Sequence, residues 1–324
     1  MKSFDEYLHI INGAIAGLEY PASPANLYEP IKYTMSLGGK RLRPVLTLMT
    51  CEAMGGDIKK ALNPALAVEM LHNSTLLHDD VMDNADVRRG KPTVHRKWNE
   101  NVAIQGGDAM LAIASGMATR VDSDILPEVL GIFSKTALEI FEGQQFDMDF
   151  EERDDVSVSE YIDMIRLKTS VLLGCAMKIG ALAAHASTAD CDAMYHVGES
   201  MGLAFQLQDD FLDVWGNEAT FGKEIGGDIM NNKKTFLLTS ALNMARGKDA
   251  EELHHWLYAA NASRQQKVDA VTNIYERLGI KSLARDEIDR YSTQAKQLLR
   301  GTNIDAPSRE TFENLIDKLT TRSE

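Results

Sequence analysis

The sequence predicts an all-α protein, built as a large bundle of about a dozen helices. Three observations favour this fold class. Apolar residues recur at helical spacing over long segments, the 324 residues include only 8 prolines, and strand-like alternation is scarce. No linker rich in serine and glycine divides the chain, and no glycine-rich phosphate loop follows a strand. We therefore expect residues 1–324 to form a single domain.

Six segments show the helical periodicity most clearly. In the first, "LAVEMLHNSTLLHDDVMD" (residues 66–83), Val68, Leu71 and Asp79 fall on or near one face of a helix. In chain order, the others are residues 101–120, 128–150, 159–186, 192–216 and 233–246. The clearest loop is "GNEATFGKEIGGD" (216–228), because it is rich in glycine and polar residues.

Composition excludes several classes of protein. A formal net charge of -14 argues against nonspecific binding of nucleic acid. The three cysteines, Cys51, Cys175 and Cys191, form no CxxC pair, which argues against a disulfide framework or a thiolate zinc site. The N-terminal "MKSFDEYLHI" has acids where a signal peptide needs an apolar core, and the C-terminal "LTTRSE" has no prenylation cysteine. No apolar run approaches the ~18 residues of a membrane span. We therefore expect a cytoplasmic protein without a nucleic-acid partner or a membrane span.

Two acidic clusters, "LLHDDVMD" (76–83) and "FQLQDDFLD" (205–213), share the pattern DDxxD. Their acids are Asp79, Asp80 and Asp83 in the first and Asp209, Asp210 and Asp213 in the second. Residues four apart share a helix face, so the first and last carboxylates of each cluster offer oxygens to one place. Such hard oxygen ligands suit Mg²⁺. A single DDxxD in an acidic chain is most simply a solvated helix face. Two copies beside Leu, Phe or Val favour metal sites, because acids next to apolar surface are costly without a cation.

Basic residues accompany both clusters. They are Lys40, Arg41 and Arg43 in "GGKRLRP", Arg88 and Arg89 after the first cluster, Lys168 in "RLKTS", Lys223 in "FGKEIGGD", and Lys233 and Lys234 in "NNKKT". Each alone is most simply a surface charge. Together they suit a diphosphate, since Arg makes fork-like contacts to phosphate and Lys acts as a point charge. Acids and bases could then be two halves of one site, bridged by metal and diphosphate.

The order of these motifs resembles that of the trans-isoprenyl diphosphate synthases, also called polyprenyl synthetases, over nearly the whole chain. The motifs are "GGKRLRP", "LHNSTLLHDDVMD", "RRGKPT", "GDAML", "EGQQFD", "KTS", "GLAFQLQDDFLD" and "GKEIGGD...KKT". The resemblance implies an all-α isoprenoid synthase fold around a deep central cavity, usually in a homodimer. It also implies a reaction. An allylic diphosphate ionises, the double bond of isopentenyl diphosphate attacks the carbocation, and a proton leaves.

The resemblance also implies a role for each matching residue. Three Mg²⁺ ions would be held by Asp79, Asp83, Asp209 and Asp213, with Asp80 and Asp210 in support. Contacts to the allylic diphosphate would come from Arg88, Lys168, Lys223 and Lys233. Contacts to isopentenyl diphosphate would come from Gly39, Lys40, Arg43, His72 and Arg89. Thr169 and Gln206 would place oxygens near the developing cation, and the released diphosphate would take the final proton.

At His72 and Asn232, the sequence context bears on the implied role. A lone histidine on an apolar helix is usually a packed core residue, but His72 lies seven residues before Asp79, two turns along the same face. Together with the motif match, this favours the diphosphate role. Asn232 stands where the family commonly has glycine. Asparagine tolerates left-handed backbone well, so the turn can persist, but whether Lys233 or Lys234 faces the diphosphate stays open.

Product length is expected to depend on the residues just before the first cluster. In the family, bulky aromatics four or five residues before the first Asp block the growing chain, whereas this sequence has Ser74 and Thr75. These small residues lie roughly 6–8 Å below the metal site. We therefore favour a C20–C25 product, as in geranylgeranyl diphosphate synthase, with a C15 farnesyl or a longer product as alternatives. A deeper floor could be formed by Leu71, Ala67, Val68, Met110, Leu111 and Met117.

Three other classes of protein fit less well. A terpene cyclase shares the first DDxxD, but its second motif usually mixes Asn or Asp with Ser and Glu. A non-catalytic regulatory subunit would be expected to lose acids from one cluster, and both are complete here. An acidic calcium-binding helical protein leaves the ordered basic residues unexplained, and no EF-hand spacing is present.

Overall fold

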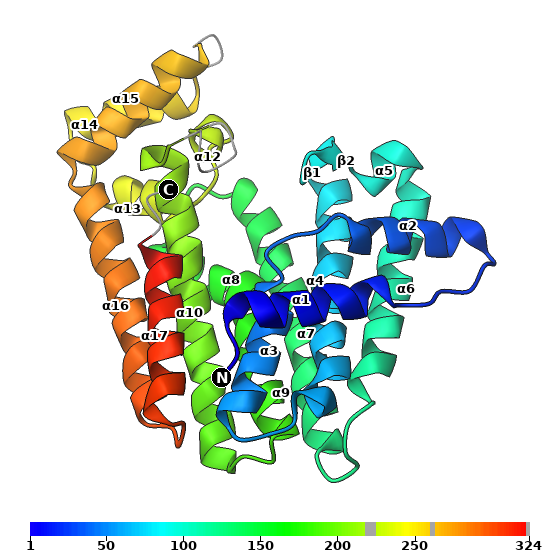
Figure 1. Ribbon diagram of the computed structural model, residues 1–324. Helices are drawn as coiled ribbons and strands as arrows, with labels where there is room; N and C mark the ends of the chain where they lie inside the picture. The colour runs from blue at the N-terminus through cyan, green and yellow to red at the C-terminus, as the bar shows by residue number, and fades with distance from the viewer. Residues whose placement is uncertain (218–224, 260–262, 322–324) are drawn as a thin grey trace. The chain divides into compact units, whose positions relative to one another are not determined.

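The computed structural model describes residues 1–217, 225–259 and 263–321, and its regular structure is almost entirely helical (Figure 1). In this part of the chain, the only strands are β1 (Val87–Arg88) and β2 (Lys91–Pro92). They pair antiparallel, with Val87 opposite Pro92 and Arg88 opposite Lys91. The predicted all-α class is therefore confirmed.

The internal contacts divide the chain into two compact units. Unit 1 comprises Met1–Ala137, Leu172–Tyr195 and Gly301–Ser308. Unit 2 comprises Leu138–Val171, His196–Arg300 and Arg309–Glu324. Each unit is assembled from three separate stretches, so no single linker separates them. The single domain expected from the sequence stays a prediction.

Unit 1 is built on the long helix α4 (Ile58–Met82). Its other complete helices are α1 (Phe4–Ala16), α2 (Ala25–Ser36), α3 (Leu42–Ala53), α5 (Val94–Lys97) and α6 (Glu100–Ala118). Figure 1 shows α6 running beside α4, and α3 packs on α4 as well. This enclosure explains why α4 is apolar around most of its circumference, with Ala65, Val68 and Met70 all fully buried.

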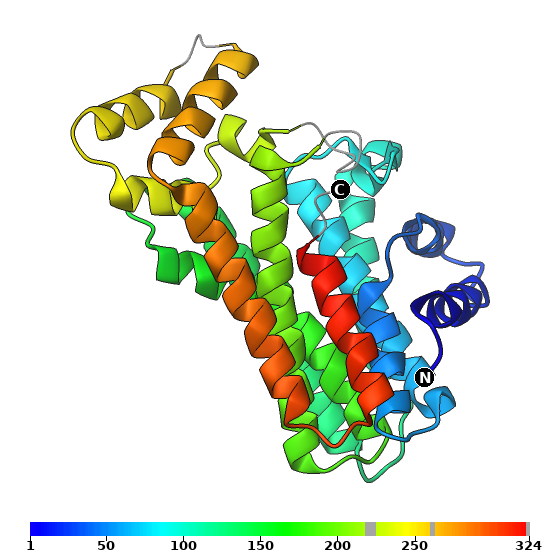
Figure 2. The same ribbon diagram turned by 60° about the vertical axis from the view of Figure 1, so that its left-hand side comes forward.

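Unit 2 holds a second apolar core. Its complete helices are α8 (Val158–Ile165), the π-helix η1 (Arg166–Ser170), α12 (Gly227–Met230), α13 (Phe236–Met244), α14 (Lys248–Leu257), α15 (Arg264–Arg277) and α16 (Ile280–Arg300). Residues of both units occur in α7 (Leu126–Glu151), α9 (Val171–Ala183), α10 (Thr188–Trp215) and α17 (Ala306–Thr320). Figure 2 shows α16 and α17 side by side, and an ion pair of 2.5 Å joins Lys296 Nζ to Asp317 Oδ1 between them. The core includes Tyr161, Phe211, Phe236, Tyr275 and Ile288.

Side-chain caps set several helix starts. Asp57 accepts from the backbone N–H of Lys59 at the start of α4, and Asn99 accepts from Val102 at the start of α6. Ser157 and Glu160 form a reciprocal capping box at α8. Each cap satisfies backbone N–H groups that have no partner within the helix.

The predicted helical segments agree with the structure except in two places. Segments 66–83, 101–120, 128–150, 192–216 and 233–246 correspond to α4, α6, α7, α10 and α13. Segment 159–186, which periodicity treats as one helix, is divided into α8, η1 and α9. The loop predicted at 216–228 gives way to α12 at Gly227, and residues 218–224 lie outside the described part.

The three cysteines are free and buried. Among the described helices, none has the length and apolar character needed to span a membrane.

Candidate active site

The first acidic cluster lies at the C-terminal end of α4, beside β1 and β2 (Figure 1). Asp83 caps the helix, and its N–H donates to the carbonyl oxygen of Asp79 at 2.8 Å. This bond keeps Asp79 and Asp83 one helical turn apart. Asp79 is partly exposed and Asp83 is exposed. The two carboxylates therefore occupy adjacent turns at an accessible helix end.

The middle acid of this cluster, Asp80, points inward. It is 5% exposed, and the Nε atom of Arg88 donates to its Oδ1 at 2.6 Å. Burial raises the pKa of the Asp80 carboxyl more than the Arg88 charge lowers it. Because the chain turns back between α4 and the β1–β2 hairpin, Arg88 lies against the acidic cluster that precedes it in the sequence.

Four of the predicted isopentenyl-diphosphate contacts lie together in unit 1. Arg43 Nη1 is 3.4 Å from His72 Nε2, and Arg89 donates to the carbonyl oxygen of Gly38. Gly39 has φ +129°, and a Cβ there would lie 2.7 Å from the guanidinium carbon of Arg89. The positive φ requires glycine at this position, whereas the end of the flexible Arg89 side chain can shift away from a Cβ. Lys40, in the same loop, is exposed.

Positive charge surrounds His72. Burial, followed by the charges of Arg43 and Arg89, holds the pKa of this imidazole well below its usual range. Burial also lowers the pKa of Arg43, to about 10, so its guanidinium stays charged at neutral pH. A neutral imidazole among guanidinium groups is an environment suited to an anion.

The residues predicted to set product length are buried in α4. Ser74 donates to the carbonyl oxygen of Leu71 at 2.7 Å, and Thr75 donates to that of His72 at 2.9 Å. Each hydroxyl is satisfied within its own helix. Met110, on the adjacent α6, is fully buried. The packing is consistent with small side chains at 74 and 75, and their role in chain length stays a prediction.

The second acidic cluster lies within α10, in unit 2. Asp210 is 4% exposed, and it accepts hydrogen bonds from the hydroxyl of Tyr161 and, at 3.2 Å, from Gln206 Nε2. Burial, followed by the charge of Asp228, raises the pKa of the Asp210 carboxyl to about 7. Asp213 is 9% exposed and accepts from the backbone N–H of Asp228 at 3.0 Å.

The second cluster therefore repeats the construction of the first. Asp209, like Asp79, is partly exposed. The acid that follows it is buried and held by neighbouring side chains, as Asp80 is.

Thr169 and Gln206 meet next to this cluster. The Thr169 hydroxyl donates to Gln206 Oε1 at 3.2 Å, and the amide group of Gln206 continues the chain of hydrogen bonds to Asp210. Thr169 belongs to the π-helix η1, an element often found at functional sites.

A shared carboxylate holds two of the predicted lysines. Asp147 Oδ2 is 2.5 Å from Lys168 Nζ and 3.8 Å from Lys233 Nζ. Lys234 instead lies 3.7 Å from Asp154. Asn232 has φ +51°, a left-handed backbone that asparagine was expected to tolerate at this position. Lys223, the remaining predicted lysine, lies outside the described residues.

Sequence reasoning missed three side chains that hold the predicted ones in place: Tyr161, Asp147 and Glu69. Asp147 ends the motif "EGQQFD", which gave a weak signal of importance without a role. Glu69 is an acid within the apolar stretch "LAVEMLHN", which was a stronger and overlooked signal. Tyr161 gave no signal, since a tyrosine on an amphipathic helix is normally core.

A cluster of two acids and one histidine lies apart from these residues. Asp122, Asp124 and His185 form a group capable of metal binding, but each ring nitrogen faces a different carboxylate, at 3.0 and 3.3 Å. Lys60 also lies 2.6 Å from Asp122, and Lys60 is 19 residues before Asp79 on α4, roughly 28 Å away. This group is therefore an ion-pair cluster at the opposite end of α4.

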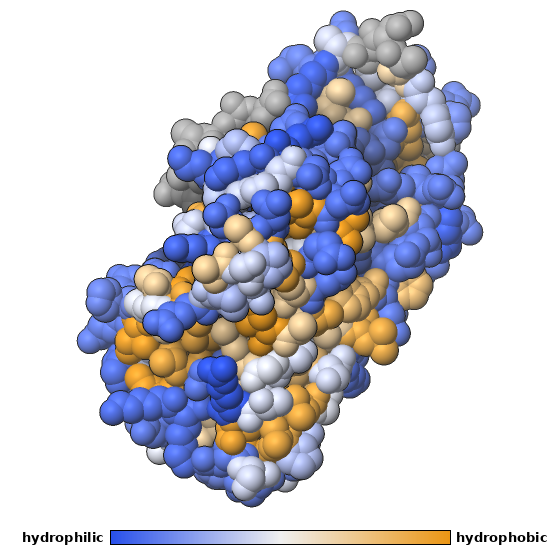
Figure 3. All heavy atoms as spheres, turned by 90° about the vertical axis from the view of Figure 1, so that its right-hand side faces the viewer, coloured by the Kyte–Doolittle hydropathy of each residue, from blue (hydrophilic) through white to orange (hydrophobic). Residues whose placement is uncertain are grey.

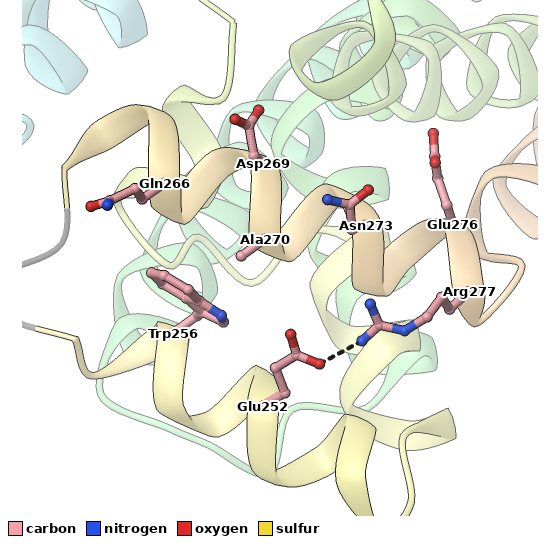
Figure 4. A pocket seen from close by; sticks show the side chains of 8 residues that line it. All are labelled: Glu252, Trp256, Gln266, Asp269, Ala270, Asn273, Glu276 and Arg277. Atoms are coloured by element: carbon pink, nitrogen blue, oxygen red, sulfur yellow. Dashed lines mark hydrogen bonds and ion pairs between the residues drawn. The ribbon is translucent and has the colours of Figure 1, made fainter.

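A groove of about 570 Å³ opens between α14 and α15 (Figure 4). It is lined by Glu252 and Trp256 of α14 and by Gln266, Asp269, Ala270, Asn273, Glu276 and Arg277 of α15. Glu252 and Arg277 form an ion pair of 2.7 Å inside it. None of the residues predicted from the motifs lines this groove.

The donors of both clusters fit a divalent cation. Asp79 and Asp83 present carboxylate oxygens at an accessible helix end, and Asp209 is the partly exposed acid of the second cluster. Oxygen donors of this kind, with room for water and phosphate, are what Mg²⁺ binds. The buried acids Asp80 and Asp210 are already held by protein groups.

Comparison with known proteins agrees with these observations. The polyprenyl synthetase family model matches residues 24–276. The geranylgeranyl diphosphate synthase of Methanosarcina mazei is 42% identical over 233 residues, which cover 71% of this chain and 72% of the relative. The geranylfarnesyl diphosphate synthase of Natronomonas pharaonis is 31% identical over 336 aligned positions, which cover 98% of this chain and 96% of the relative.

The fold comparison gives the same answer. A crystal structure of a geranylgeranyl pyrophosphate synthase matches all of this chain over all of its own length, with a TM-score of 0.95 and 42% identity. With the family model covering most of the chain and the paired DDxxD clusters in place, this chain belongs to the polyprenyl synthetase family.

Proposed function

We propose that this chain, a prenyl-transferring enzyme by its family, condenses isopentenyl diphosphate head-to-tail with an allylic diphosphate. The product would be a linear all-E isoprenyl diphosphate of C20–C25. The observation that carries the proposal is the matching construction of the two DDxxD clusters. In each, the first acid is partly exposed and the second is buried and held by the protein, by Arg88 in one and by Tyr161 and Gln206 in the other.

Magnesium would be held by the exposed and partly exposed acids Asp79, Asp83 and Asp209, with Asp213 completing the set. Three ions are expected from the resemblance. When bound, they would neutralise the charge that develops on the leaving diphosphate. Asp80 and Asp210 would keep the neighbouring carboxylates in position through their own hydrogen bonds.

The basic residues would bind the two diphosphates. Lys168 and Lys233, held at Asp147, would contact the allylic diphosphate with Arg88 and Lys223. Arg43, His72, Arg89 and the loop residues Gly39 and Lys40 would contact isopentenyl diphosphate. A neutral His72 can donate a hydrogen bond to a phosphate oxygen without adding charge.

The chemistry would proceed by loss of diphosphate from the allylic substrate. Oxygens of Thr169 and Gln206 would stabilise the resulting carbocation, and their mutual hydrogen bond holds them in one orientation. The double bond of isopentenyl diphosphate would then form the new C–C bond. As the family resemblance implies, the proton lost in the last step would pass to the released diphosphate.

The proposal also includes the product length, the homodimer and the cellular location. The C20–C25 length rests on the small residues Ser74 and Thr75 and on the names of the two relatives. The homodimer is implied by the family resemblance and supported by apolar side chains exposed at the surface, among them Ile104 of α6, which is 44% exposed. Figure 3 shows apolar side chains gathered on the face where α6 lies. The cytoplasmic location remains a prediction from the sequence.

One assay tests the proposal. The purified chain is incubated with Mg²⁺, isopentenyl diphosphate and, in separate reactions, C5, C10 and C15 allylic diphosphates, and products are identified by mass spectrometry. Linear C20–C25 diphosphates that disappear when a chelator removes Mg²⁺ are expected. Cyclic hydrocarbons would instead identify a cyclase, and no turnover with any primer would identify a non-catalytic subunit.

A further inference from the structure

A buried ion pair lies beneath the loop that carries the proposed contacts to isopentenyl diphosphate. Arg41 Nη1 is 2.5 Å from Glu69 Oε1, and each side chain is only 2% exposed. Arg41 Nη2 donates to the carbonyl oxygen of Met35 at 2.6 Å, and Asn73 Nδ2 donates to Glu69 Oε1 at 2.9 Å. One guanidinium thus ties the end of α2 and the start of α3 to the middle of α4.

Stability does not account for this pair. Taking two charges out of water costs about as much as their attraction returns, so well-packed apolar residues would hold the helices at least as well. Arg41 also has φ +47°, a left-handed backbone that is unfavourable for a residue with a side chain. Such strain persists where the surrounding structure enforces it, and it is concentrated at functional sites.

The pair fixes the geometry of the loop. Gly38 and Gly39, with φ of +78° and +129°, turn the backbone sharply before it reaches Arg41. Lys40 immediately precedes Arg41, and Arg43 follows in the first turn of α3. The position of Arg41 therefore decides the direction in which Lys40 and Arg43 leave the backbone.

The other end of the pair fixes His72. Glu69 lies three residues before His72 on α4, so the two side chains project from the same face one turn apart. Arg43 Nη1 is 3.4 Å from His72 Nε2. The same ion pair therefore holds the Arg43 guanidinium and the His72 imidazole at a fixed separation.

We propose that Arg41 and Glu69 are positioning residues, a clamp that places Arg43 against His72 and orients the adjacent Lys40 for binding of isopentenyl diphosphate. Neither residue needs to touch the substrate. This inference rests on the proposed function and deepens it. The clamp affects one of the two diphosphate sites, because its contacts reach Met35, the loop and α4 and include none of Lys168, Lys233 or Asp147.

The test replaces the whole pair. Glu69→Gln alone would leave a buried unpaired guanidinium, so the informative variant is R41M/E69L, in which both charges are removed together. Its control is K2M/E52Q, because Lys2 and Glu52 form another ion pair of unit 1, of 2.6 Å, at the far end of α3. Gln at 52 removes the charge and keeps an oxygen that accepts from the buried Tyr7 hydroxyl. Steady-state kinetics are measured with each substrate varied in turn, and thermal unfolding is followed for every variant.

The expected result is a split between substrates. R41M/E69L should raise KM for isopentenyl diphosphate about tenfold or more, since small misplacements of binding groups cost this much. KM for the allylic diphosphate should stay close to wild type, whereas the unfolding midpoint should fall because the Met35 carbonyl oxygen loses its buried donor. K2M/E52Q should change neither KM. A wild-type KM for isopentenyl diphosphate in R41M/E69L, or an equal rise in both KM values, overturns the clamp.

A milder variant covers the case in which R41M/E69L does not unfold cooperatively. Arg41→Lys keeps the charge. Its single ammonium group cannot reproduce the two separate contacts of the guanidinium, to the Met35 carbonyl oxygen and to the Glu69 carboxylate. It should raise KM for isopentenyl diphosphate alone, and an unchanged KM overturns the clamp. If the wild-type chain turns over no isopentenyl diphosphate, both the proposed function and the clamp are wrong. If the wild-type chain is active and the variants keep a wild-type KM, only the clamp is wrong.

Discussion

Asp147 shows how a single residue organises part of the site. Its Oδ2 lies 2.5 Å from Lys168 Nζ and 3.8 Å from Lys233 Nζ. Burial raises the pKa of this carboxyl, but the charges of Lys233 and Lys168 outweigh burial, and the pKa lies below its ordinary value of 3.8. The carboxylate is therefore charged at neutral pH, and it holds together two cations that would otherwise repel each other.

Asp147→Asn should lower kcat about tenfold or more, because the two lysines lose their common anchor and move from the diphosphate. It should also change acid stability. A carboxyl with a lowered pKa contributes stability above its unfolded pKa, and this contribution is lost as pH falls through the folded value. Thermal unfolding between about pH 5 and pH 3 should therefore be less pH-dependent in Asp147→Asn than in wild type.

Asp149→Asn is the matched control for this change, because Asp149 is exposed, lies two residues further on in α7, and accepts from Gln145 at 2.7 Å. It should keep wild-type kcat. If Asp147→Asn shows the same kcat and the same pH dependence as the control, the shared-anchor explanation is wrong.

Ser74→Phe should shorten the main product. Ser74 is 2% exposed, and an aromatic ring five residues before Asp79 would fill space that the growing hydrocarbon is proposed to use. Mass spectrometry of the products measures the change. Ser74→Ala removes the hydroxyl without adding bulk and should leave product length unchanged. An active Ser74→Phe enzyme with wild-type products would refute this assignment.

Site residues could be predicted from the sequence where a motif indicates their chemistry. They could not be predicted where only tertiary packing brings a side chain to the site. The motif match named Lys168 and Lys233, and the structure places them on one carboxylate. That carboxylate, Asp147, could not be assigned, because its partners lie 21 and 86 residues away in the chain. The same holds for Tyr161, whose partner Asp210 is 49 residues away.

At the scale of elements, the main departure from the sequence prediction is the π-helix η1. Two glycines pack against it within unit 2. A Cβ at Gly143 of α7 would lie 2.4 Å from the backbone nitrogen of Lys168, and a Cβ at Gly202 of α10 would lie 2.5 Å from the Cα of Ser170. These close approaches hold the backbone that carries Lys168 and Thr169. Hydrophobic periodicity does not reveal them, because glycine contributes nothing to an apolar pattern.

Gly143→Ala should therefore lower kcat, although the change adds only one methyl group. The obstacle is backbone, which cannot move aside as a flexible side chain can, so η1 must shift and carry Lys168 and Thr169 with it. Destabilisation of about 1–3 kcal/mol is expected from overpacking. Steady-state kinetics and thermal unfolding measure the two effects.

Gly131→Ala provides a control on the same helix. No atom lies within 4 Å of a Cβ at Gly131, so this substitution should stabilise α7 by roughly 0.5–1 kcal/mol through helix propensity. It should leave kcat unchanged. If Gly143→Ala behaves like Gly131→Ala, the close packing of η1 does not matter for catalysis.

At the scale of the whole molecule, the sequence predicted the fold class and the family, and both are confirmed. Ordered motifs spread over nearly the whole chain carry that information, because each needs a particular residue type at a particular place. The division into two compact units was not predicted, since most of their boundaries fall inside helices, in α7, α9, α10 and α17, rather than at linkers. The central cavity and the homodimer stay predictions.

The homodimer can be tested through α7. Leu138, Phe141 and Met148 are 59%, 40% and 42% exposed, and their spacing of three and seven residues places them on one face of the helix. A solvent-exposed apolar stripe of this kind favours contact with another protein surface. In a homodimer, the contact would be with a second copy of this chain.

Light scattering during gel filtration should therefore give twice the chain mass of 35.9 kDa. Replacing Leu138 and Phe141 together by Glu should shift the mass to that of a single chain, because two charges on each copy would have to be buried at the contact. Met244→Glu changes an apolar residue of α13 that is 46% exposed, and it should keep the dimer mass. A wild-type chain that elutes with the mass of one copy contradicts the homodimer, and a dimeric L138E/F141E variant would place the contact elsewhere than on α7.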